Sequence, residues 1–113
     1  AYFKSVGFAG KHKRPVSAID LDAKGQIYIA SAYDPDDNGP FTSVIWRAGH
    51  IRADSNNRIR LVFPRKPVKL ATLDGFKVES VAVREGKAGL IELFAGTDDE
   101  NYGGAVRAIP IER

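Results

Sequence analysis

The chain has 113 residues, of which 43% are hydrophobic, so it has the size of one ordinary domain and enough apolar content to bury a core. Its 17 basic residues against 14 acidic residues give a net charge of +3, an excess too small to indicate nucleic acid as a partner. The absence of cysteine excludes disulfides and thiolate metal sites, and no apolar run approaches the roughly 18 residues that a membrane helix needs. We therefore expect neither nucleic acid nor a membrane as a partner.

Strand-type periodicity dominates the first half of the chain. Residues 16–21 alternate apolar with small or polar side chains, and residues 26–30 form a β-branched and aromatic run, so both are predicted to be strands. Gly25 can take the positive φ of a tight turn between them, which predicts an antiparallel hairpin. Residues 42–47 and 58–63 are the next predicted strands, and two prolines after the last one place it at a sheet edge.

The second half repeats this order of strands. The offset between corresponding residues is nearly constant, from Val16 to Val78 and from Val44 to Ala105. We expect three segments: an N-terminal strand with a basic loop over residues 1–13, a first blade-like repeat over 14–73 and a second over 74–113.

An antiparallel meander must bury an apolar face against a partner, so repeated meanders are expected to pack on each other. We therefore predict an all-β fold of two antiparallel four-stranded meanders that are β-propeller blades, with a β-sandwich as the alternative. Propellers typically need about four to eight blades, which predicts further blades from the same protein or from a homo-oligomer. The N-terminal strand, over residues 2–8, is expected to supply the outer strand that the second unit lacks.

Two stretches of the second half resemble a known family. Residues 73–82, LDGFKVESVA, and residues 94–104, FAGTDDENYGG, resemble the end of the propeller in bacterial phytase-like and esterase-like β-propeller proteins. The resemblance implies a multi-bladed propeller that is often exported, so we expect an extracellular or periplasmic protein. It also implies the calcium and phosphate-ester chemistry of the characterised phytases.

The loop after the second predicted strand has the spacing of a calcium site. Asp34, Asp36 and Asn38 place oxygen-bearing side chains at alternate positions, and a glycine follows, as in the first half of a calcium loop. The chelating glutamate of an EF-hand is missing, because Ile45 stands at the twelfth position. The alternative is an ordinary solvated turn, which uses the same residue types.

The corresponding loop of the second repeat contains three successive carboxylates, Asp98, Asp99 and Glu100. Carboxylates this dense repel one another unless a cation neutralises them, so together with Glu79 they are a possible second site for a metal or for acid–base chemistry. The alternative for the loop is a charged hairpin tip in water. Alternation places Glu79 on one face with Lys77 and Val81, so it is either a buried functional residue or a surface partner of Lys77.

Lys11, Lys13 and Arg14 form a basic run before the first repeat, which can bind a phosphate ester or another anion, or remain a solvated loop. The sequence contains no serine-hydrolase elbow and no phosphate-cradling glycine loop. We therefore expect a β-propeller module that serves as a binding or scaffold domain and binds calcium. The alternative is a calcium-dependent phosphate-ester hydrolase of the phytase type.

Overall fold

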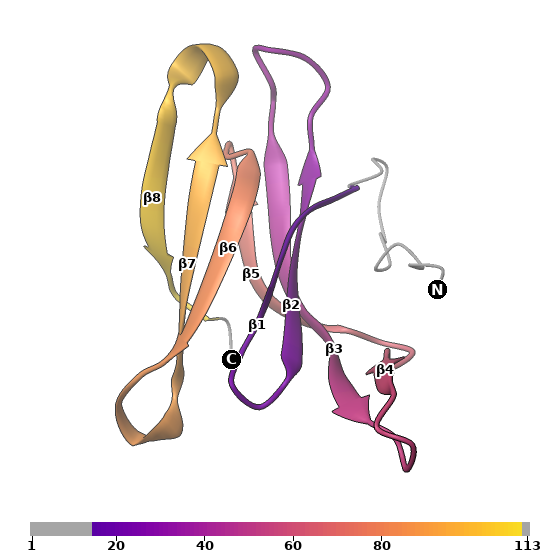
Figure 1. The fold of residues 1–113 in the computed structure, drawn as a ribbon. Coiled ribbons are helices and arrows are strands. Elements are labelled where there is room, and N and C mark those ends of the chain that lie inside the picture. The colour runs from indigo at the N-terminus through magenta and orange to yellow at the C-terminus, as the bar shows by residue number, and fades with distance from the viewer. Residues whose placement is uncertain (1–14, 112–113) are drawn as a thin grey trace.

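The structure of the chain, a computed structural model, describes residues 15–111. Within that range the backbone forms two antiparallel β-sheets joined by short connections (Figure 1). The fold is all-β, as the strand periodicity predicts, and the helices of residues 15–111 include none long and apolar enough to cross a membrane. The predicted strand over residues 2–8 and the basic residues Lys11, Lys13 and Arg14 lie outside the described residues.

The first sheet contains β1 (Val16–Leu21), β2 (Gln26–Tyr33), β3 (Thr42–Ala53), β4 (Ile59–Val62) and β5 (Val68–Asp74). The long β3 pairs with β2 on one side, and on the other side with β5 over its first part and β4 over its last part. The second sheet contains β6 (Val78–Glu85), β7 (Ile91–Asp98) and β8 (Gly104–Ile109), in that order. The short 3-10 helices η1 (Lys87–Gly89) and η2 (Glu100–Tyr102) lie in the connections on either side of β7.

The fourth strand of the first meander differs from the sequence prediction. Residues 58–63 contain β4, which lies at the sheet edge as expected but pairs only with the far end of β3. The fourth strand of the meander is instead β5, which the sequence pattern does not predict. Leu70 and Ala71 are adjacent residues within β5, and both are buried because the register shifts there, opposite Ile45. This bulge interrupts the alternation of buried and exposed residues that identifies a strand.

Strand pairing supports the predicted repeat. β1 has a register shift between Val16 and Ala18, and β6 has the same irregularity between the corresponding residues Val78 and Ser80. A β-bulge is a local departure from a regular ladder, so its recurrence at equivalent positions indicates that the second sheet repeats the first. The second unit has three strands within residues 15–111, and the segment expected to supply its outer strand lies outside the described residues.

A hydroxyl side chain on the second strand of each unit lies near a carbonyl oxygen of the third strand, which relates the third strands of the two units. Ser31 of β2 pairs with Val44, and its Oγ donates to the carbonyl oxygen of that residue at 3.4 Å. Thr97 of β7 pairs with Ala105, and its Oγ1 lies 3.5 Å from the carbonyl oxygen of that residue. By strand pairing, Val44 and Ala105 therefore occupy equivalent positions in the two sheets.

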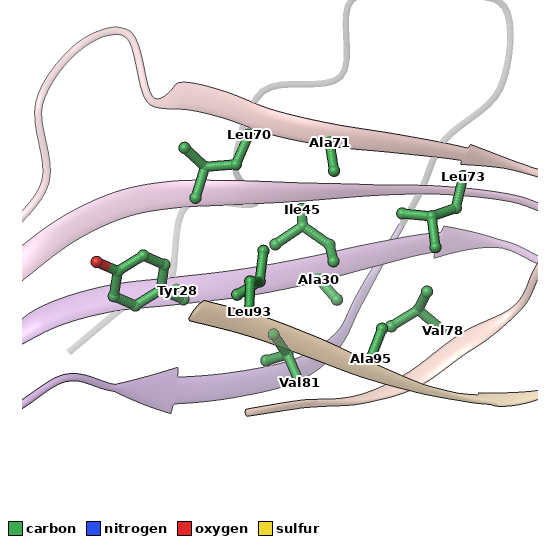
Figure 2. Packing of buried hydrophobic residues seen from close by; sticks show 10 residues of the cluster. All are labelled: Tyr28, Ala30, Ile45, Leu70, Ala71, Leu73, Val78, Val81, Leu93 and Ala95. Carbon is green, nitrogen blue, oxygen red and sulfur yellow. The ribbon is translucent and has the colours of Figure 1, made fainter. Parts of the chain in front are cut away.

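The two sheets pack face to face through β6, which lies against β1 and β2. Figure 2 shows the shared core, to which the first sheet contributes Tyr28, Ala30, Ile45, Leu70, Ala71 and Leu73, and the second contributes Val78, Val81, Leu93 and Ala95. By strand pairing, Tyr28 corresponds to Phe94, and Ile45 corresponds to Val106. We call the face of either unit that carries these residues its front face, and the opposite face its back face.

The packing joins unlike faces of the two units. Ile45 on the front face of the first sheet is fully buried, whereas its counterpart Val106 on the front face of the second sheet is 82% exposed. The second sheet enters the core with its back face, through Val81 and Leu93. The front face of the first unit therefore covers the back face of the second, a head-to-tail arrangement.

Hydrogen bonds fix β6 against the first sheet along its length. The buried Ser43 hydroxyl donates to the Phe76 carbonyl oxygen at 2.8 Å and accepts the Val78 N–H at 3.0 Å. Further along the strand, the Val83 N–H donates to Asp20 Oδ2 at 2.8 Å. Because each bond satisfies a polar group next to the core, the relative position of the two sheets is defined by polar contacts as well as by apolar packing.

Truncation of the two equivalent front-face residues should have very different effects. We expect Ile45→Ala to lower the free energy of unfolding by about 2 to 4 kcal/mol, because it leaves a cavity between the sheets. Val106→Ala should change it by less than about 0.5 kcal/mol, because that side chain is in water. Urea unfolding of both variants tests the head-to-tail core, and similar losses from the two changes would contradict it.

Candidate functional site

Three connections meet at one end of the molecule: the β2–β3 loop, the β5–β6 connection and the β7–β8 loop (Figure 1, upper end). Asn101 Nδ2 donates to Asn38 Oδ1 at 3.1 Å and joins the two long loops directly. We call this region the acidic end, because eight carboxylates lie in or beside these connections: Asp34, Asp36, Asp37, Asp74, Glu79, Asp98, Asp99 and Glu100. Lys77 is the only basic residue in the same three segments.

Lys77 brings together carboxylates from both long loops. Its Nζ lies 2.8 Å from Asp34 Oδ2 in the first loop and forms a second ion pair with Glu100 in the second loop. Glu79 Oε1, near the start of β6, lies 3.5 Å away. The Lys77 side chain is only 12% exposed, whereas the three carboxylates are between 30% and 45% exposed. A nearly buried ammonium thus connects the two loops beneath a layer of solvated carboxylates.

The pKa of Lys77 is raised above that of an ordinary lysine. The main cause is the hydrogen bond to Asp34, followed by the one to Glu100, while burial acts in the opposite direction. The ammonium therefore keeps its charge at neutral pH and acts as a fixed cation rather than as a base or nucleophile. The stability that these bonds provide is present below the pKa of an unfolded lysine and is lost as pH rises through the folded-state value.

Asp99 holds the backbone of Lys77 in place. It is 7% exposed, its Oδ1 accepts the Lys77 N–H at 2.7 Å, and its Oδ2 accepts the Thr97 hydroxyl at 2.9 Å. The Lys77 carbonyl oxygen in turn accepts the Asp98 N–H at 3.0 Å. One oxygen of the Asp99 carboxylate therefore holds the Lys77 backbone, while the other is held by the Thr97 hydroxyl.

The structure divides the predicted second acidic site, Glu79, Asp98, Asp99 and Glu100, into separate roles. Glu100 pairs with Lys77, and Asp99 is a buried brace. Asp98 is exposed and accepts the Glu100 N–H through Oδ1 at 3.2 Å, which helps to shape the loop. Only Glu79 and Glu100 of this set therefore share a cation.

The predicted position of Glu79 needs a correction. The pair that it was expected to form with Lys77 is present, but Glu79 does not share a face with Val81. The bulge between Val78 and Ser80 turns Val78 and Val81 to the core and leaves Glu79 exposed. Simple alternation fails at this point because one extra residue reverses the orientation of those that follow.

The three predicted calcium ligands, Asp34, Asp36 and Asn38, each have a partner within the protein. Asp34 pairs with Lys77, Asp36 Oδ1 accepts the Asn38 N–H at 2.8 Å, and Asn38 accepts from Asn101. The hydrogen bonds expected of an ordinary Asx turn are therefore formed. Across residues 15–111, no three or more histidine, cysteine or acidic side chains are grouped in a way that could hold a metal ion. Calcium at this loop stays a prediction.

A concave surface at the opposite end lies between the β1–β2 turn and the β6–β7 connection. Tyr28, 1% exposed, donates its hydroxyl proton to Asp22 Oδ2 at 3.0 Å, and Asp22 Oδ1 accepts the N–H groups of Lys24 and Gln26 at 2.9 Å each. Burial, with the neighbouring Asp22, raises the pKa of Tyr28 to about 12. The Asp22 carboxylate and the Tyr28 hydroxyl, which line this surface, therefore form hydrogen bonds that stabilise the β1–β2 hairpin.

Comparison of the chain with models of known protein families, with curated proteins and with solved structures finds no match. The propeller family that residues 73–82 and 94–104 resemble therefore stays a prediction. The alternative of phosphate-ester hydrolysis stays one as well. A functional assignment has to rest on the geometry of the chain itself.

Removal of the shared ammonium should destabilise the protein more than removal of an exposed one. We expect Lys77→Met to lower the free energy of unfolding by about 1 to 2 kcal/mol, because two loops lose their common cation and the remaining carboxylates repel one another. Arg84→Met, which breaks the exposed Arg84–Glu92 pair, is the matched control and should cost less than about 0.5 kcal/mol. Equal losses in urea unfolding would rule out a special role for Lys77.

Tyrosine titration should identify Tyr28. As pH rises, one tyrosine of the folded protein should ionise near pH 12, visible as late tyrosinate absorbance that Tyr28→Phe lacks. Because unfolded tyrosine ionises near pH 10, the stability associated with neutral Tyr28 is lost between about pH 10 and pH 12 and amounts to about 2 to 3 kcal/mol. A native protein whose tyrosines all ionise near pH 10 would contradict this expectation.

Proposed function

We propose that the chain is a β-propeller-type repeat module that serves as a binding or scaffold domain. The observation that supports it is the head-to-tail packing of two equivalent sheets, in which the front face of one covers the back face of the next. Both faces of the unit carry apolar side chains, which suits a blade with a neighbour on each side. A two-sheet sandwich needs only one apolar face per sheet. An extracellular or periplasmic location is part of the same proposal.

The acidic end is the proposed binding surface, with calcium as its ligand. Eight carboxylates around one ammonium create a negative potential there, and carboxylate and amide oxygens are the ligands that a hard cation prefers. Asp34 is already paired with Lys77, so we propose that Asp36 provides the principal contact to calcium and that Asp34 and Asn38 assist it. The Lys77 pairs support this arrangement by holding the two loops together.

Calcium should stabilise the protein through Asp36. If it binds, calcium at ten times its dissociation constant should add about 1.4 kcal/mol of stability and raise the melting temperature by several degrees. Asp36→Asn should abolish this shift, while its amide oxygen still accepts the Asn38 N–H and keeps the turn. Asp37→Asn, a charge change at the adjacent exposed position, should leave most of the shift. No shift in the unmodified protein at about 10 mM calcium would refute the proposed ligand.

A further inference from the structure

The second sheet presents an uncovered front face. It is made of small and apolar side chains from three neighbouring strands, Ala82 on β6, Phe94 and Gly96 on β7, and Val106 and Ala108 on β8. Ala82, Val106 and Ala108 are exposed, and the Arg84 guanidinium lies 5.1 Å from the centre of the Phe94 ring at one end of this face. The same face of the first sheet is covered by β6.

β1 carries the complementary surface on its back face. Its three large apolar side chains, Val16, Ile19 and Leu21, are 43%, 52% and 43% exposed. Their counterparts in β6 are Val78, Val81 and Val83. Val78 is fully buried, Val81 is 9% exposed, and Val83 packs against the same core. β1 therefore exposes to solvent an apolar stripe equivalent to the one that β6 buries against the first sheet.

These two exposed surfaces correspond to the β6 part of a contact that the chain already makes once. Ile27 and Ile29, the counterparts of Leu93 and Ala95 in that contact, are already buried in the first unit. Within the chain, the back stripe of β6 packs on the front faces of β1 and β2. The equivalent contact between chains sets the back stripe of β1 on the front faces of β6 and β7. The small side chain of Ala82 leaves room for the approaching side chains, whereas the Ser80 side chain fills the space above Gly96.

We propose that a second copy of this chain docks head to tail on the front face of the second sheet, with Val16, Ile19 and Leu21 of its β1. This inference rests on the proposed repeat module and names its partner. A heterologous contact of this kind leaves one free surface at each end of a dimer, so it continues until a ring closes. With two units in each chain, a ring of about four to eight blades corresponds to about two to four copies.

The contact between copies is weaker than the contact within the chain. Asp20, which accepts the Val83 N–H across the internal contact, corresponds to Ala82 on the uncovered front face. A second copy therefore finds no carboxylate there for the N–H of its Leu21, the counterpart of Val83. Assembly should consequently depend on protein concentration, while each chain remains folded when diluted.

Sedimentation of the 113-residue chain tests the proposal. The unmodified chain should exceed the 12.3 kDa of one copy, by an amount that grows with concentration until a ring closes. Val106→Lys and Ile19→Lys each place a charge in one half of the contact and should abolish association. Ile59→Lys is the matched control: it changes an apolar residue, 69% exposed, on β4 and should leave association unchanged.

An equal mixture of the two blocked variants provides the decisive measurement. Val106→Lys keeps a working β1 stripe and Ile19→Lys keeps a working front face, so the mixture should form dimers and nothing larger. A mixture that stays monomeric although both variants are folded, or an unmodified chain of 12.3 kDa at every concentration, would overturn the docking proposal. The rise in melting temperature that calcium should cause through Asp36 is measured separately. A chain that shows this rise but does not associate refutes only the docking proposal, whereas a chain that shows neither refutes both.

Discussion

Apolar side chains on both faces of the repeating sheet are the constraint on which the rest of the structure depends. A sheet with one apolar face is satisfied by one partner, whereas this unit needs a neighbour on each side. Inside the chain, Ile45 and Tyr28 meet the back face of the second sheet, and a second buried cluster of Ile27, Ile29 and Ala48 lies on the back face of the first sheet. The strand order, the bulge shared by β1 and β6 and the hydrogen bond from Val83 to Asp20 all serve this contact.

The same contact creates the acidic end. Because the two units stack in register, the loop after the second strand of each unit emerges on the same side, and Asn38 meets Asn101. So many carboxylates in one place would repel one another in the absence of a cation. Lys77 stands between the units, in the short connection from β5 to β6, and its ammonium reaches Asp34 and Glu100. The charge of one residue thus permits the stacking that the apolar faces favour.

Local pattern predicts the regular parts of this fold and fails where the backbone departs from regularity. β1, β8 and the turn at Gly25, with φ of +80°, follow from alternation and from glycine chemistry. The sequence pattern does not predict β5, because its bulge buries two adjacent residues of the strand. The bulge in β6 likewise reverses the orientation expected for Glu79. At the acidic end, sequence identifies the loops but not their common partner, because the ion pairs of Lys77 join residues far apart in the chain. The one available signal is that Lys77 is the sole cation among those segments.

The second sheet ends on a strand with one neighbour. Among residues 15–111, β8 pairs only with β7. Half of its backbone N–H and C=O groups therefore face away from the sheet, whereas the equivalent groups of β3 pair with β5. Such an edge accepts any extended chain and is a starting point for fibrous aggregation. Pro110 follows the strand directly and removes a donor, and Arg107 adds a charge whose guanidinium lies 4.3 Å from the centre of the Phe76 ring. These two residues act as gatekeepers that limit uncontrolled growth of the sheet along this edge.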